Sequence, residues 1–221
     1  MERHDLYRPI HKALRLLQAR TLTLIGVTDF SDEAAAARTL DVVRELLQTG
    51  AKHLEHEEAV IHPLLAARAP DAVILLEAQH GEHRAAFAEF FHLAGRIATA
   101  DAPERPAQGR ELYLALARFM AADFLHMAHE EQVIMPLLQR LFTDEELIAV
   151  EGEIVASIPP DELTVLLQAM LEALSRPERA QLMGGVRAGA PPGVFEQLMQ
   201  ATACEVLSDD DLIDLNRRLA A

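Results

Sequence analysis

The strongest constraint on this chain is a segment that occurs twice. Residues 53–65 are HLEHEEAVIHPLL and residues 126–138 are HMAHEEQVIMPLL, so the second copy follows the first by 73 positions. His, His, Glu, Glu, Val, Ile, Pro, Leu and Leu recur at the same places in both copies. A repeat of this kind indicates two copies of one supersecondary unit, and this unit carries side chains that bind metals.

Helical geometry places the first His and the first Glu of each copy on one apolar face. At about 100° per residue, Glu130 lies about 40° from His126, and Glu57 has the same relation to His53. This face is completed by apolar residues, which are Val60, Ile61 and Leu64 in the first copy and Val133, Ile134 and Leu137 in the second. An ionised Glu at the centre of an apolar face is costly unless it is paired or bound to a metal. The two copies therefore predict a shared metal site, and imidazole with carboxylate suits iron, manganese or zinc.

Other polar positions of the repeat fall away from this face. Glu58 and Glu131 lie about 140° from the first His, and His62 lies about 180° from it. We assign these three residues to the rim of the site or to solvent. His56 and His129 are expected at the edge of the apolar stripe.

Composition limits the class of protein. The 221 residues are 50% hydrophobic and 5% aromatic, which favours helix and provides enough core to fold unaided. A formal net charge of −15 opposes nucleic acid or an anionic membrane as a partner. Cys204 is the only cysteine, so neither an intrachain disulfide nor a cysteine metal cluster is expected. The first residues do not resemble a secretory signal, and no apolar run of about 18 residues predicts a transmembrane helix, so we expect a cytoplasmic protein.

Four long helices are predicted from apolar periodicity and from helix breakers. They cover residues 4–28, residues 31–68 with Ser31 or Asp32 as N-cap, the stretch from Pro70 to the breakers at 102–109, and about 108–142. His11 lies on the apolar face of the first helix and His80 on that of the third. Because the other two helices already need partners for their metal-binding residues, we expect both as ligands. His83 is a less favoured alternative beside His80.

A further helix and an extension follow. Thr143–Glu146 is a capping-box pattern that starts a helix to about residue 157. Pro159 and Pro160 mark the expected boundary, which gives a bundle with the metal site and a following helix at 1–157 and a helical extension at 158–221. The extension contains no histidine, and we expect it to be a helical cap or a homodimer surface. A functional lid or a surface for a protein partner is the alternative.

The order of these motifs resembles the hemerythrin family, and more narrowly its HHE cation-binding branch. The resemblance covers about residues 4–142 and implies an all-α, up-down four-helix bundle that binds two iron ions. It implies that the terminal iron ligands are His11, His53, His80 and His126. It also implies that Glu57 and Glu130 bridge the two irons, together with an oxo or hydroxo group. The chain departs from respiratory hemerythrins, because His80-x-x-His83 replaces His-x-x-x-His and Glu130 replaces an Asp.

Several functions stay open from the sequence. The resemblance implies a non-haem di-iron protein that binds or responds to oxygen, nitric oxide or peroxide in sensing, storage or stress defence. An oxidoreductase that reduces peroxide or nitric oxide is the alternative, and whether the protein is an enzyme stays open. A structural or interaction bundle with incidental zinc is a third interpretation.

A ferritin-like di-iron bundle is a further alternative. Glu77-x-x-His80 and Asp123-x-x-His126 have the Glu-x-x-His spacing of such bundles or its Asp analogue. Such bundles also need a Glu from each remaining helix, and the first helix here has no central Glu. In the hemerythrin-like interpretation, Glu77 and Asp123 are instead candidates to orient the imidazoles through their second nitrogen.

Overall fold

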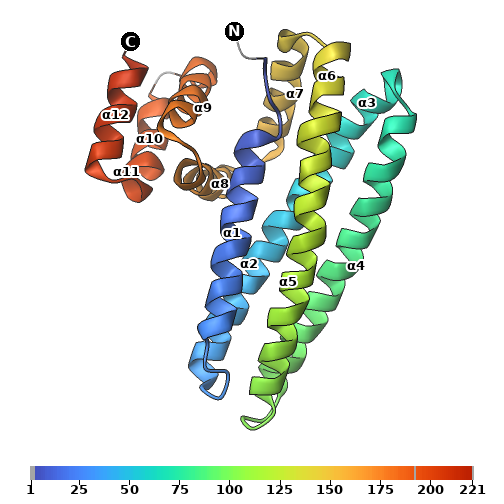
Figure 1. Cartoon of the computed structure of the whole chain (residues 1–221). Coiled ribbons are helices and arrows are strands. Elements are labelled where there is room, and N and C mark those ends of the chain that lie inside the picture. Colours follow the sequence, from blue (N-terminus) through green and yellow to red (C-terminus); the bar gives the residue numbers. More distant parts are fainter. Residues whose placement is uncertain (1–2, 192, 221) are drawn as a thin grey trace. The chain divides into compact units, whose positions relative to one another are not determined.

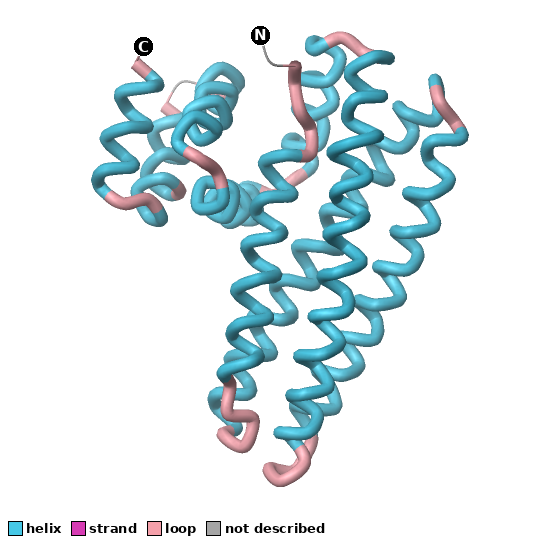
Figure 2. Tube along the Cα trace, viewed as in Figure 1, coloured by secondary structure: helices cyan, strands magenta, loops and turns pink. Residues whose placement is uncertain are grey.

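The computed structural model describes residues 3–191 and 193–220, and residues 1, 2, 192 and 221 lie outside this description. The described part of the chain is helical, with only turns and short loops between the helices (Figure 2), which confirms the predicted all-helical class. Contacts divide the chain into two units. One combines the described residues up to His4 with Leu17–Val150, and the other combines Asp5–Leu16 with the described residues from Glu151 onward. The boundary predicted at residue 158 stays a prediction.

The first unit is built around long helices that lie side by side in Figure 1. They are α1 (Arg8–Val27), which belongs to this unit from Leu17, α2 (Glu33–His56), α4 (Asp71–Thr99) and α5 (Arg105–His129). Their inward faces form one hydrophobic core, in which Leu47, Leu93 and Leu112 are almost fully buried. Burial of apolar surface of this kind is the main stabilising contribution to a helical domain.

The helix ends follow the local sequence. Asp32 is the N-cap of α2 and accepts hydrogen bonds from the backbone N–H groups of Ala34 and Ala35, which confirms one of the two predicted caps. At the start of α5, Gly109 lies against the ring of Phe30. A Cβ atom at this position would lie 2.3 Å from Phe30 Cδ2, so the close approach requires glycine.

Both copies of the repeat contain a π-helical turn. The first, η1 (Glu57–Ile61), leads into α3 (His62–Arg68), and the second, η2 (Glu130–Ile134), leads into α6 (Met135–Leu141). After each turn, the N–H of His62 or Met135 donates to the carbonyl of the Glu that opens the turn. The next residue in each copy is proline, which has no N–H and clashes with the carbonyl four residues earlier. A π turn accommodates this by inserting one extra residue into the helix.

The extra residue shifts the buried face beyond the two glutamates. Ile61 and Ile134 are buried as predicted, but Val133 is 49% exposed. The fully buried leucines are Leu65 and Leu138, each one position later than a regular helix predicts. The predicted face is therefore wrong after the turn, because regular α-helical spacing does not hold across it.

The same shift corrects the expectation for His62. The residue is only 4% exposed, so the prediction that it lies at the rim of the site or faces solvent is wrong. In the second copy the corresponding residue is Met135, which is also buried.

The second unit contains the C-terminal helices. The helix α7 (Asp144–Ser157) begins in the first unit and continues into the second. It starts with the predicted capping box, in which Thr143 and Glu146 exchange hydrogen bonds of 2.8 and 3.2 Å. The remaining helices are α8 (Pro160–Ala173), α9 (Arg176–Gly189), α10 (Val194–Ala201), α11 (Ala203–Val206) and α12 (Asp209–Leu219). They enclose a small core that includes Leu171, Met183 and Leu215.

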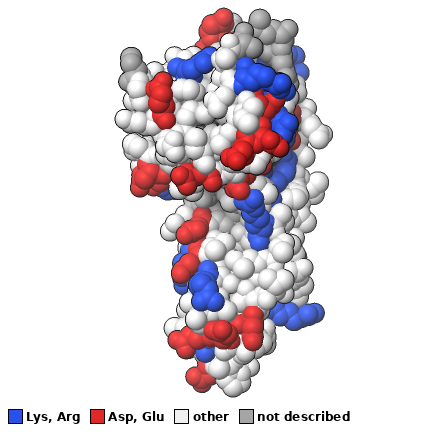
Figure 3. All heavy atoms as spheres, turned by 90° about the vertical axis from the view of Figure 1, so that its left-hand side faces the viewer, with Lys and Arg blue, Asp and Glu red and all other residues white. Residues whose placement is uncertain are grey.

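Charged side chains of both signs lie next to one another on the surface that Figure 3 shows. In the second unit, Arg176 and Arg179 both contact Asp211, at 2.7 and 2.9 Å. Lys12 of α1 contacts Glu178 of α9 at 2.7 Å. None of the helices in the described parts of the chain is both long enough and apolar enough to cross a lipid bilayer.

Candidate metal centre

Two buried carboxylates define the centre of the site. Glu57 opens η1 and Glu130 opens η2, and the two residues are 1% and 0% exposed. An ionised carboxylate removed from water to this extent costs several kcal/mol unless positive charge compensates it. The pair therefore requires a cation or a proton in its immediate surroundings.

One group of possible ligands contains both glutamates and two imidazoles. Glu57, His80, His126 and Glu130 each offer one ligand atom, and these atoms all lie within 4.8 Å of one another. All four residues are buried. His80 Nε2 lies 3.4 Å from Glu57 Oε2, and His126 Nε2 lies 3.4 Å from Glu130 Oε2.

A second group uses the same two glutamates. His53, Glu57 and Glu130 also offer ligand atoms within 4.8 Å of one another, and His53 Nε2 lies 3.2 Å from Glu57 Oε1. Each carboxylate has two oxygens, so Glu57 and Glu130 can contribute to both groups at once. Five of the six favoured ligand residues are thus brought together in the first unit.

His11, the sixth, lies on the part of α1 that belongs to the second unit. Its side chain is fully buried and its ring stacks on that of Tyr7, with the ring centroids 5.2 Å apart. Its role as a ligand stays a prediction.

The hydrogen bonds behind the imidazoles fix which ring nitrogen faces the glutamates. His80 Nδ1 is 3.0 Å from Glu58 Oε1, and because a carboxylate only accepts, Nδ1 is the donor. The lone pair of His80 Nε2 then points towards Glu57, and this nitrogen has no hydrogen-bond partner. A lone pair facing a carboxylate oxygen is repulsive unless a proton or a metal cation lies between them. The donor set therefore fits a bound metal cation.

His126 has a similar arrangement with a different partner. Its Nδ1 lies 3.0 Å from Gln79 Oε1, so its Nε2 is the nitrogen that faces Glu130. Hydrogen bonds of this type set the tautomer and the orientation of metal-binding imidazoles.

Glu58 has contacts that its position in the repeat does not predict. Its side chain is 35% exposed, as expected for the rim, but it also accepts hydrogen bonds from His80 and Arg84. Partial burial raises the pKa of the Glu58 carboxyl, and the bonds from Arg84 and His80 outweigh this, so that the pKa lies below its ordinary value. Glu58 is therefore ionised at neutral pH.

Two further histidines lie beside the site. His62 packs against His80 with ring centroids 4.8 Å apart, and burial, together with the neighbouring His80, lowers its pKa to about 4. His83 meets the ring of His126 edge-on at 4.8 Å, and its Nε2 lies 3.7 Å from Asp123 Oδ1. Burial lowers the pKa of His83, and Asp123 opposes this effect. His83 is absent from both ligand groups found in the described parts of the chain.

The structure also bears on the other candidates. Glu77 is exposed, so the ferritin-like alternative lacks its carboxylate on the third long helix. Asp123 accepts a hydrogen bond of 2.6 Å from Gln18 and lies near His83. Sequence reasoning missed Glu58 and Gln79 as the partners of the imidazoles. Their contacts join different helices, which no spacing within one helix reveals.

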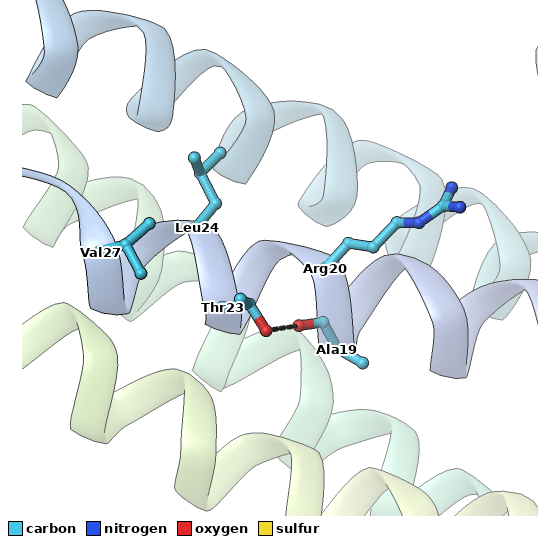
Figure 4. Close-up of a pocket in the computed structure, with 5 residues that line it drawn as sticks. All are labelled: Ala19, Arg20, Thr23, Leu24 and Val27. Carbon is cyan, nitrogen blue, oxygen red and sulfur yellow. Dashed lines mark hydrogen bonds between the residues drawn. The ribbon is translucent and has the colours of Figure 1, made fainter.

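A shallow hollow on the exposed side of α1 provides no alternative site (Figure 4). It is lined by Ala19, Arg20, Thr23, Leu24 and Val27. The Thr23 hydroxyl donates to the carbonyl of Ala19 at 2.9 Å. The lining contains neither imidazole nor carboxylate, so this hollow offers no side chain that suits a metal ion.

Comparison with known families agrees with this chemistry. The description of the matching family is hemerythrin HHE cation binding domain, and the match covers residues 4–138, which is more than half of the chain. No curated protein and no solved structure matches the chain. The paired His and Glu groups are what a cation-binding domain requires. The chain belongs to the hemerythrin HHE cation-binding family.

Proposed function

We propose that the protein holds two iron ions bridged by Glu57 and Glu130, with an oxo or hydroxo group as a further bridge. His80 and His126 complete one metal position, and His53 and His11 complete the other. The helices around them form an up-down four-helix bundle.

The observation that carries this proposal is the sharing of both glutamates between two ligand groups. One group adds His80 and His126, and the other adds His53. A single metal ion would not need two sets of imidazoles, whereas two cations close together need bridging anions. Imidazole and carboxylate donors suit iron, although they also accept manganese or zinc.

The register of α1 supports His11 as the remaining donor. Gln18 follows His11 by seven residues, so the two side chains lie about 20° apart around the helix. Gln18 donates to Asp123, which lies one turn before His126 on α5. His11 therefore shares one face of α1 with Gln18, whose hydrogen bond to Asp123 is a contact with α5.

We further propose that the iron pair binds or responds to oxygen, nitric oxide or peroxide. The protein donors would leave room at the metal pair for a small molecule, and iron would supply reversible one-electron chemistry there. Glu57, Glu130, His80 and His126 are almost fully buried, which keeps bulk water from the site. A buried, partly open metal pair suits sensing, storage or defence against these molecules.

Removing the bridges tests the assignment. Glu57→Ala and Glu130→Ala should each reduce the bound iron from about two ions per chain to one or fewer and abolish the spectrum of the bridged pair, because each metal loses a ligand. Glu55→Ala is the matched control, because Glu55 is an exposed glutamate two positions before Glu57. Iron analysis and absorption spectroscopy provide the measurement. Equal iron loss in all three variants, or a full complement in Glu57→Ala, would contradict the bridging role.

A further inference from the structure

The two imidazoles of one ligand group differ in what lies behind them. His80 Nδ1 donates to the carboxylate of Glu58, and His126 Nδ1 donates to the amide oxygen of Gln79, both at 3.0 Å. The front nitrogens of both rings face a buried glutamate at 3.4 Å. The site is therefore nearly symmetric in its ligands and asymmetric in the charge behind them.

Adjacent glutamates of η1 contact His80 on opposite sides. Glu57 Oε2 lies 3.4 Å from Nε2, and Glu58 Oε1 lies 3.0 Å from Nδ1. One glutamate thus faces the metal position and the next faces the back of the ring. His80 has no freedom to rotate without losing one of these contacts.

Arg84 completes this arrangement. It lies one helical turn after His80 on α4 and donates to the same Glu58 oxygen that accepts from His80. Its side chain is 54% exposed, whereas the His80 side chain is fully buried. A charged chain of contacts therefore connects the surface, through Glu58, to a ring at the metal position.

A carboxylate behind a metal-binding imidazole fixes its tautomer and strengthens its electron donation to the metal. A hydrogen bond that involves a charged group is also stronger than one between neutral groups, such as the bond from His126 to Gln79. The positive charge of Arg84 on the same carboxylate oxygen offsets part of the negative charge of Glu58. It therefore weakens the effect of Glu58 on His80. Glu58 and Arg84 therefore act on His80 in opposite directions.

We propose that Glu58 is a positioning residue for His80 and that Arg84 is its counter-charge. Together they fix the His80 tautomer, and they adjust metal affinity and reduction potential at the position that His80 and His126 share. The effect on potential rests on the proposed iron pair. The effect on the tautomer does not, because it belongs to the protein alone.

The first test uses metal-free protein and nitrogen-15 NMR of the His80 ring. In the unsubstituted protein and in Glu82→Gln, we expect a proton on His80 Nδ1, where Glu58 accepts it. In Glu58→Met, which has no carboxylate to accept the bond, we expect Nδ1 to lose this proton in part of the molecules. Full protonation of Nδ1 in Glu58→Met, as in the unsubstituted protein, would overturn the proposal.

The second test uses the iron-loaded protein. Glu58→Gln should weaken the affinity for iron about 10- to 100-fold and raise the reduction potential, because a neutral amide replaces the carboxylate behind His80. Arg84→Gln should lower the reduction potential, because no positive charge then offsets the carboxylate of Glu58. Chelator competition and redox titration measure the two quantities.

Glu82→Gln is the matched control for charge alone. Glu82 is an exposed glutamate on α4 between His80 and Arg84, and its charge acts on the nearby His83. Glu58→Gln is expected to change both the iron affinity and the reduction potential. We expect Glu82→Gln to leave these two quantities close to those of the unsubstituted protein. Equal effects of Glu58→Gln and Glu82→Gln, or shifts of the same sign in Glu58→Gln and Arg84→Gln, would overturn the proposal. If the unsubstituted protein bound no iron, the proposed function would fail while the tautomer test still decided the role of Glu58.

Discussion

At the scale of single residues, His62 shows how one inserted residue changes the environment of a side chain. Regular helical spacing places it opposite the metal-binding face, yet it is buried against His80. Neither of its ring nitrogens has a hydrogen-bond partner. A buried polar group without a partner costs about 1–3 kcal/mol.

The second copy of the repeat suggests the variant that tests this cost. Met135 occupies the position of His62 there, and it is buried. His62→Met should raise the unfolding free energy of the metal-free protein by about 1 kcal/mol, since the apolar side chain removes the unpaired nitrogens. Urea denaturation measures the change. A loss of stability together with a loss of bound iron would show instead that the imidazole serves the site.

At the scale of elements, the π turns separate what the sequence predicts from what it does not. The start of α2, the capping box before α7 and the inward faces up to Glu57 and Glu130 follow from local rules, because each depends on neighbouring residues within one helix. Beyond the glutamates, the prediction uses the wrong period. Pro63 and Pro136 carry the signal for this change, since a proline inside a helix disturbs its hydrogen bonds. The partners of His80 and His126 belong to other helices, so no pattern within one element could identify them.

The N-terminus of α9 provides a test at the same scale. Ser175 and Glu178 form a capping box, and Glu178 also accepts from Lys12 Nζ at 2.7 Å. Burial raises the pKa of Glu178, but the hydrogen bonds from Lys12 and Ser175 outweigh this and lower it from 4.5 to about 2. Because the folded-state pKa is depressed, the stabilisation is complete above pH 4.5 and is lost as pH falls towards 2.

Glu178→Gln should therefore lower the unfolding free energy of the metal-free protein by about 1–2 kcal/mol at pH 7, a value reduced for the solvent exposure of Lys12. The difference from the unsubstituted protein should narrow as pH falls below 4.5. Denaturant titrations at several pH values measure it. A difference that stays constant with pH would mean that the charge of Glu178 contributes nothing.

At the scale of the whole molecule, the family and the helical class are predictable because they rest on motifs that are compact in sequence. Each His-x-x-x-Glu pair lies within two turns of one helix, and the family match covers the residues that contain both pairs. The grouping of Asp5–Leu16 with the C-terminal helices is different. It depends on contacts such as Lys12 with Glu178, which are 166 residues apart, and neither residue has a local signature for the other.

The measurement that most directly tests the proposed iron pair is the metal content of the whole protein, purified from iron-supplied cells, with absorption spectra before and after azide. We predict about two irons per chain and an oxo-bridged spectrum that azide changes, because Glu57 and Glu130 serve two ligand groups at once. One zinc ion per chain, or no metal, would contradict the proposed iron pair.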